Sequence, residues 1–187
     1  VCLPGEVPEC RYPGGISFCH DMGIANVFSR NGYSSYESGG RTGCFSYMTT
    51  EQLMNWICCA VTYVARTGDL DWLTSKTGTL RRCQESLLNR DHPDPDQRNG
   101  LQGTDSSRCQ GGHEITTYDS LDSSLGQARN NLYLSVKGWA AWKGLALMWD
   151  RLGDTERKKQ AHEHGELAAR TIVTEAKSHD AIPAILF

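Results

Sequence analysis

The sequence predicts an all-α fold in which helical hairpins, separated by long loops, form part of an α/α toroid. Apolar residues recur at three- and four-residue spacing over residues 50–67 and in later segments, which is the period of an amphipathic helix. The joints Gly68-Asp69 and Gly153-Asp154 each end an apolar helix and begin a second one, so the chain contains a weak internal repeat of helix–turn–helix units. Pairs of inner and outer helices build a toroid, and two clear pairs predict an arc of such a ring.

Composition and charge exclude several classes of protein. The 187 residues suffice for one domain with a core, or for part of a larger domain. A net charge of −3 and a pI near 6.1 argue against nucleic acid or an anionic membrane as the main partner, because both require a basic surface. No apolar run reaches the roughly 18 residues of a membrane span. Because the chain has no initiator Met and its last residues are apolar and uncapped, we expect a processed chain or a piece of a longer one.

The eight cysteines leave two interpretations open. An even number permits disulfides in an oxidising compartment, with Cys2–Cys10 as the favoured local pair, and leans weakly towards secretion without settling the localisation. Buried free thiols are the alternative, because Cys58 and Cys59 are adjacent in a helical pattern and point to different faces. No Cys-x-x-Cys pair supports zinc or redox chemistry.

Residues 1–49 are predicted to be irregular, because Pro and Gly interrupt every helical period. Within them, His20 and Asp21 precede Gly23 in a loop that either binds a polar ligand or forms a solvated turn.

Residues 50–90 are predicted to form the first hairpin. Thr49 or Thr50 can cap its first helix, and Glu51 lies in the first turn. Gly68 ends that helix, and Asp69 or Asp71 caps the next one, which has a possible weak point at Gly78.

Residues 91–121 are predicted to be a loop that carries the site. Asp94 and Asp96 faintly resemble a calcium loop, but Arg98 breaks the pattern and the distal Glu is missing, so a solvated turn is favoured. A loop of this length usually has a function.

Residues 122–177 are predicted to form the second hairpin. An inner helix over about 122–151 is apolar around most of its circumference and would be capped by Asp122. Gly153 ends it, and Asp154 or Thr155 caps an outer helix over about 155–177 with one polar face.

A long motif, residues 113–134, closely resembles the retaining β-xylosidases of glycoside hydrolase family 52. Shorter matches follow the same order along nearly the whole chain: residues 19–23, 32–36, 42–48, 89–95 and 105–108. A more distant likeness is to the β-glucosidases of family 116. The resemblance implies a β-sandwich domain followed by an (α/α)6 catalytic domain, of which this chain would be a middle-to-late segment, a partial (α/α)6 toroid. It also implies that the nucleophilic Glu lies upstream, outside these residues.

The resemblance implies roles for individual residues. The Asp of the triplet Thr117-Tyr118-Asp119 corresponds to the family's acid/base, and the family 116 likeness implies that Thr117 and His20, with Asp21 beside it, contact the sugar. A general acid needs a raised pKa, which apolar neighbours and nearby carboxylates would supply. Substrate binding is also expected of Glu114 and Arg129. The alternatives are that Glu114 pairs with Arg129 or Arg108, and that Arg129 ties the loop down.

The expected function is that of a retaining exo-β-xylosidase acting on xylooligosaccharides. Such an enzyme needs two carboxylates about 5–5.5 Å apart, and this chain would supply only the acid/base. The remainder of the catalytic domain, or another chain, would then supply the nucleophile. A β-glucosidase, or a non-catalytic helical fragment or carbohydrate-binding relative, is the alternative. No cofactor or metal is expected, because the sequence has no Gly-rich phosphate loop and no metal-ligand spacing.

Overall fold

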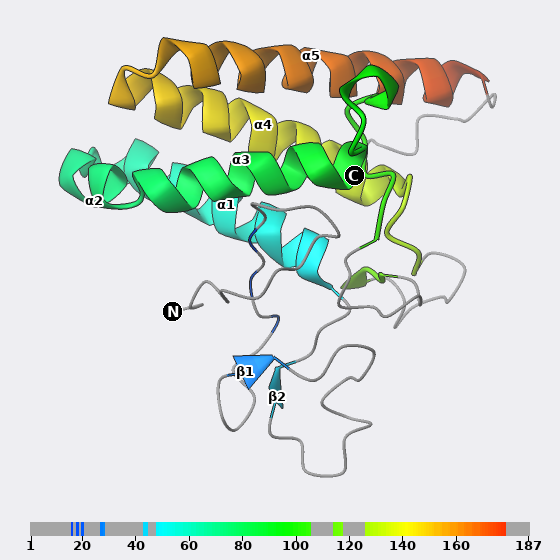
Figure 1. The fold of residues 1–187 in the computed structure, drawn as a ribbon, viewed down its shortest axis with the longest axis horizontal. Coiled ribbons are helices and arrows are strands. Elements are labelled where there is room, and N and C mark those ends of the chain that lie inside the picture. The colour runs from blue at the N-terminus through cyan, green and yellow to red at the C-terminus, as the bar shows by residue number, and fades with distance from the viewer. Residues whose placement is uncertain are drawn as a thin grey trace.

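The computed structural model describes residues 16, 18, 20, 27–28, 43–44, 48–105, 114–117 and 126–178. Its helices are α1 (Thr49–Thr67), α2 (Leu70–Ser75), α3 (Thr77–Asp91), the 3-10 turn η1 (Pro95–Gln97), α4 (Leu132–Leu152) and α5 (Thr155–Ser178) (Figure 1). Two-residue strands β1 (Val27–Phe28) and β2 (Gly43–Cys44) pair in parallel within the region predicted to be irregular. The all-α class is confirmed, whereas the toroid and the division into loop and hairpin regions remain predictions.

The two predicted joints have the same local structure. Gly68 follows α1 with φ 67°, and Gly153 follows α4 with φ 74°, so both occupy the left-handed region that favours glycine. The Asp69 carboxylate then accepts a hydrogen bond from the N–H of Trp72 at 2.8 Å, which caps α2. The Asp154 carboxylate likewise accepts from the N–H of Arg157 at 3.0 Å. Both turns were therefore predicted correctly, and the structure selects Asp69 and Asp154 from the two capping candidates that were left open at each joint.

The second predicted helix is interrupted at Lys76 rather than at Gly78. The N–H of Lys76 bonds to the carbonyl of Leu73 at 3.0 Å, which ends α2. Gly78 lies in the first turn of α3 instead.

The predicted start of the inner helix at about residue 122, with Asp122 as its cap, is wrong. Asp122 lies outside the described residues, and the cap of α4 is Asn131, whose side chain accepts from the N–H of Leu134 at 3.2 Å. Asn130 has φ 52°, a left-handed conformation that a helix cannot include. Residues 126–128 pair with residues 114–116, so their backbone groups bond to another segment.

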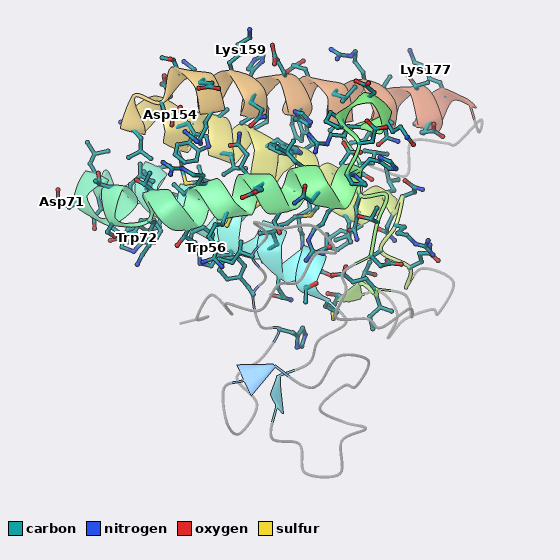
Figure 2. The ribbon with its side chains drawn as sticks, in the orientation of Figure 1. Trp56, Asp71, Trp72, Asp154, Lys159 and Lys177 are labelled. Carbon is teal, nitrogen blue, oxygen red and sulfur yellow. The ribbon has the colours of Figure 1, made fainter. Side chains whose placement is uncertain are left out.

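Helix α4 packs against both α1 and α5, as expected of an inner helix. Gly138 and Gly144 let α1 approach closely, because a Cβ at these positions would lie 3.1 Å from the Met54 side chain and 3.0 Å from Val61. Helix α5 covers α4 and directs Lys159 and Lys177 away from it (Figure 2). The outer position and polar face of α5 were predicted.

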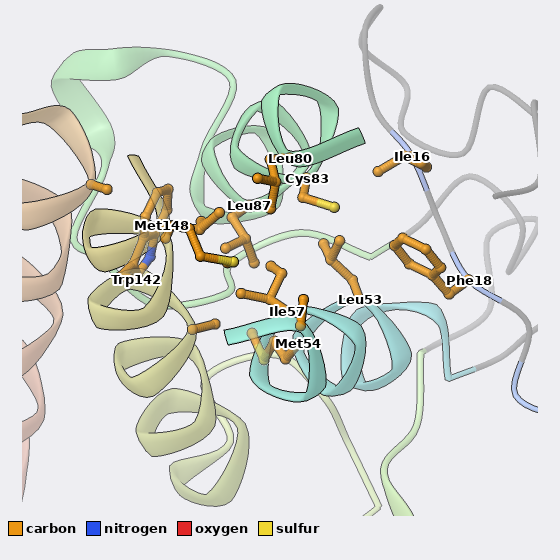
Figure 3. Close-up of a cluster of buried hydrophobic side chains, with 14 of the residues drawn as sticks. Ile16, Phe18, Leu53, Met54, Ile57, Leu80, Cys83, Leu87, Trp142 and Met148 are labelled. Atoms are coloured by element: carbon orange, nitrogen blue, oxygen red, sulfur yellow. The ribbon is translucent and has the colours of Figure 1, made fainter. Parts of the chain in front are cut away.

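One apolar core joins the helices to the segment that contains Ile16 and Phe18 (Figure 3). The Ser86 hydroxyl of α3 donates to the Ile16 carbonyl at 2.8 Å and accepts from its N–H at 3.2 Å. Phe18 stacks on Trp56 of α1, with ring centroids 4.9 Å apart. Burial of these two side chains therefore fixes the chain just before His20.

The loop after α3 docks on α5. The buried Asp91 carboxylate accepts from the N–H groups of Asn99 and Gly100, at 3.0 and 2.7 Å. The Thr171 hydroxyl of α5 donates to the Asn99 carbonyl at 2.6 Å. The exposed Asp94 carboxylate caps η1, which confirms a solvated turn there.

Three of the eight cysteines lie where the structure describes side chains, and all three are free thiols: Cys58, Cys59 and Cys83. Cys59 is exposed and Cys58 half-buried, so the two do face differently. The predicted Cys2–Cys10 pair lies outside the described residues.

Candidate functional site

The predicted site loop lies against the N-terminus of α1. Its described part, residues 114–117, pairs with residues 126–128 through an antiparallel bridge between Ile115 and Gln127. The N–H of Thr116 donates to the Gly126 carbonyl at 2.8 Å. This pairing brings the end that carries Thr117 next to the segment that leads into α4.

Glu114 forms a buried ion pair with Arg90, at 3.0 Å between Arg90 Nη1 and Glu114 Oε2. The Thr49 hydroxyl donates to Glu114 Oε1 at 2.7 Å, and the Thr50 hydroxyl donates to Glu114 Oε2 at 3.1 Å. The backbone N–H of Thr50 also donates to the Glu114 carboxylate. Because Met48 makes no side-chain cap, this distant carboxylate caps α1. The predicted capping by Thr49 or Thr50 is wrong, since both are helical residues that donate to Glu114.

Arg129 pairs with Asp105 at 3.1 Å, rather than with Glu114. Asp105 also accepts from the backbone N–H of Glu114, at 3.3 Å. The structure therefore brings Glu114 and Arg129 together through Asp105, which ties the loop to the segment before α4. Arg129 itself precedes α4 instead of lying within it.

The second carboxylate at this end of α1 belongs to Glu51, whose side chain is only 2% exposed. Thr117 donates to it twice, from its N–H to Oε2 at 3.0 Å and from its hydroxyl to Oε1 at 2.9 Å. The Tyr133 hydroxyl and the Lys137 ammonium, both on α4, donate to Oε1 at 2.7 and 3.1 Å. Lys137 also donates to Asn55 at 2.9 Å and to the Tyr133 hydroxyl.

These contacts decide the charge state of the cluster. Burial by itself would raise the pKa of Glu51, but the hydrogen bonds from Tyr133 and Thr117 and the positive charge of Lys137 outweigh it, so the pKa is lowered. Burial would lower the pKa of Lys137, yet its bonds to Tyr133 and Glu51 raise it. At neutral pH the cluster is therefore an ion pair with a neutral phenol beside it.

The predicted site residues are distributed as follows. Thr117 is exposed at the end of the described loop segment, and Glu114 is fully buried three residues earlier. His20 is exposed, in a bend two residues after the buried Phe18. Asp21 and Asp119 lie outside the described residues, and the substrate-contacting roles of all these residues remain predictions.

Arg90, Asp105, Tyr133 and Lys137 were missed as parts of this arrangement, and Glu51 was noted only as a first-turn acid. One signal in the sequence could have indicated the cluster: Lys137 is the one charged residue in the first half of a largely apolar helix, four residues after Tyr133. Arg90 lies in α3 and its partner Glu114 lies in the loop that follows, so no local pattern could have revealed the pair.

Among the residues that the structure describes, no three or more His, Cys, Asp and Glu side chains gather where they could hold a metal ion. None of the helices in this part of the chain has the length and apolar composition to cross a membrane.

The fold and the site define a helical segment in which two buried carboxylates hold a polar loop at the end of α1. The family model described as glycosyl hydrolase family 52 matches residues 1–63. A β-xylosidase of Geobacillus stearothermophilus is 54% identical over 186 residues, which cover 100% of this chain and 26% of that protein. A second β-xylosidase from the same organism is 42% identical over 174 residues, covering 93% of this chain and 28% of that protein.

The chain thus resembles glycoside hydrolase family 52, as its motifs predicted. It spans about a quarter of the length of the curated relatives it matches.

Proposed function

We propose that this chain is part of a retaining β-xylosidase and supplies its acid/base, Asp119. The observation that carries the proposal is the 54% identity, along the whole chain, to a protein named a β-xylosidase. The substrate would be an oligosaccharide with β-linked xylose at its non-reducing end. A β-glucosidase of related fold remains the second candidate for the sugar.

The proposed chemistry divides between this chain and residues outside it. Asp119 would protonate the leaving glycosidic oxygen and then, as a base, take a proton from the water that releases the sugar. The nucleophilic carboxylate would come from the remainder of the catalytic domain or from another chain. Thr117 and His20, with Asp21, would contact the sugar. Thr117 is exposed, while two hydrogen bonds from its own N–H and hydroxyl to Glu51 hold it, which suits a contact residue.

For Glu114 and Arg129 we propose support of the loop in place of direct sugar binding. Glu114 is fully buried in its pair with Arg90, and Arg129 pairs with Asp105. We also propose that the two hairpins are an arc of an (α/α)6 toroid. The support is the inner position of α4, the outer position of α5 and the repeated Gly-Asp joints.

The test uses the full-length protein that carries this sequence, with xylooligosaccharides as substrates with poor leaving groups and the p-nitrophenyl β-xyloside and β-glucoside as activated substrates. We expect Asp119→Ala to abolish hydrolysis of substrates with poor leaving groups and azide to restore turnover of the activated xyloside, because azide replaces the water that the base activates. Asp71→Ala, on the exposed side of α2, is the matched control and should leave the rate unchanged. Full activity without Asp119 would refute its role, and hydrolysis of the glucoside alone would favour the second candidate.

A further inference from the structure

Glu51 is the one residue of α1 whose carboxylate reaches both the predicted sugar-site loop and α4. We infer that Glu51 is a positioning residue, which holds Thr117 in the orientation that the proposed site requires. This inference rests on the proposed function, because it assigns Thr117 and its neighbour Asp119 to that site.

The geometry of the Glu51–Thr117 contact constrains the loop in two ways. The N–H and the hydroxyl of Thr117 bond to different oxygens of one carboxylate, at 3.0 and 2.9 Å. The first bond fixes the backbone, and the second fixes the side-chain rotamer, so neither can change while both persist. Asp119, which the proposed function assigns to the same site, follows two residues later in the sequence.

The carboxylate is itself held rigidly from the other side. Tyr133 and Lys137 lie four residues apart on one face of α4 and both donate to Glu51 Oε1. Lys137 also bonds to Asn55, one turn further along α1. Glu51 therefore fixes the orientation of Thr117 relative to two packed helices, α1 and α4.

Joining α1 to α4 does not require the contact with Thr117. The bonds from Lys137 and Tyr133 to Glu51 already connect the two helices. Thr117 stays exposed although it forms two bonds to a buried carboxylate. Their effect is to fix the position of an exposed residue, which is what a binding site needs.

The experiment compares Glu51→Gln with Glu166→Gln in the full-length protein. Glu166 forms an exposed pair with Lys143 at 3.0 Å, so it controls for loss of a Glu–Lys pair between helices. In Glu51→Gln, the side-chain NH2 group would replace one of the two carboxylate oxygens that accept hydrogen bonds from the N–H and hydroxyl of Thr117, so one of these bonds would be lost. Below the unfolding temperature we expect kcat/KM to fall about 100-fold in Glu51→Gln, as for a small misplacement of reacting groups. The control should match the unchanged protein.

A double substitution separates positioning from general destabilisation. If Glu51 acts through Thr117, Glu51→Gln combined with Thr117→Ala should lower kcat/KM little more than the stronger single change. The inference would be overturned if the fold-losses in kcat/KM of the two single variants multiply in the double variant. An unchanged kcat/KM in folded Glu51→Gln would also overturn it.

Amide hydrogen exchange tests the inference without a measurement of activity, so its result does not depend on the proposed function. In Glu51→Gln the peptide that contains Thr117 should exchange faster, while the core peptides of α1 and α4 keep their protection. If the unchanged protein hydrolyses neither glycoside, the proposed function fails. Hydrogen exchange then tests the inference by itself, and unchanged protection of the Thr117 peptide in Glu51→Gln overturns it. If Glu51→Gln does not fold, Glu51→Asp replaces it, because it keeps the charge beside Lys137 and withdraws the carboxylate by one methylene.

Discussion

Two buried carboxylates meet the first turn of α1, and they differ in what they bind. Glu114 is paired with Arg90 and with the hydroxyls of Thr49 and Thr50, all of them buried. Glu51 bonds instead to the exposed Thr117 and to α4. The first carboxylate therefore stabilises the helix end and the loop, and the second connects that end to the site.

Glu114→Gln should lower the free energy of unfolding by about 3–5 kcal/mol, because it leaves the buried guanidinium of Arg90 without its counter-charge. Urea unfolding followed by circular dichroism measures the change. Glu166→Gln, which removes an exposed carboxylate from its pair with Lys143, should leave the unfolding curve within error. Equal, small effects of both changes would contradict the structural role of the Arg90 pair.

Thiol reactivity should rank the three described cysteines. Burial raises the pKa of the Cys83 thiol well above its usual range, and burial also raises that of Cys58, whereas Cys59 is exposed. Iodoacetamide labelling at neutral pH, read by peptide mass spectrometry, should modify Cys59 first and Cys83 only after unfolding. Labelling of Cys83 in the folded protein at the rate of Cys59 would contradict the packing of α3.

At the scale of elements, two glycines share a left-handed backbone but differ in their surroundings. Gly153, between α4 and α5, has φ 74° and open space where a Cβ would be. Gly100, in the loop that docks on α5, has φ 89°, and a Cβ there would lie 2.4 Å from the backbone nitrogen of Ala168. Only Gly100 is also required for close contact between two segments, the loop and α5.

Gly153→Ala should therefore cost about 1 kcal/mol of unfolding free energy, the strain of a left-handed alanine. Gly100→Ala should cost at least about 2 kcal/mol more, because the backbone of α5 must also move. Parallel urea titrations compare the two variants. A similar loss in both would show that the loop and α5 are less tightly packed than the structure indicates.

For the whole molecule, the Glu51 cluster links stability to pH. Because the pKa of Glu51 is lowered in the folded state, its contribution to the free energy of unfolding is fully present above the unfolded-state pKa of about 4.3. This contribution is lost as the pH falls through the lower, folded-state pKa.

Asp91 acts in the opposite direction. Burial raises its pKa, although bonds from Asn99 and Gly100 oppose the shift, so Asp91 favours the folded state on acidification.

The difference in unfolding free energy between the unchanged protein and Glu51→Gln isolates the first effect. It should be largest at neutral pH and narrow as the pH falls below about 4.3, since a protonated Glu51 loses its charge attraction to Lys137. Urea titrations at a series of pH values test this, and a difference independent of pH would refute an ionised Glu51 in the folded protein.

Much of the helical architecture could be predicted because its signals are local. The apolar period of α1, the left-handed Gly68 and Gly153, and the capping Asp69 and Asp154 depend on residues a few positions apart. Such signals act the same way wherever the helix packs, so the sequence by itself determined the all-α class and the two joints.

Only the tertiary structure decided where α4 begins and what the buried carboxylates bind. Residues 126–128 continue a pattern compatible with a helix, but pairing with residues 114–116 engages their backbone groups, and Asn131 becomes the cap. Glu114 meets Arg90, and Glu51 meets Thr117 and Lys137, across loops or between helices. The energy of these contacts comes from groups far apart in the chain, whose approach depends on how the helices pack.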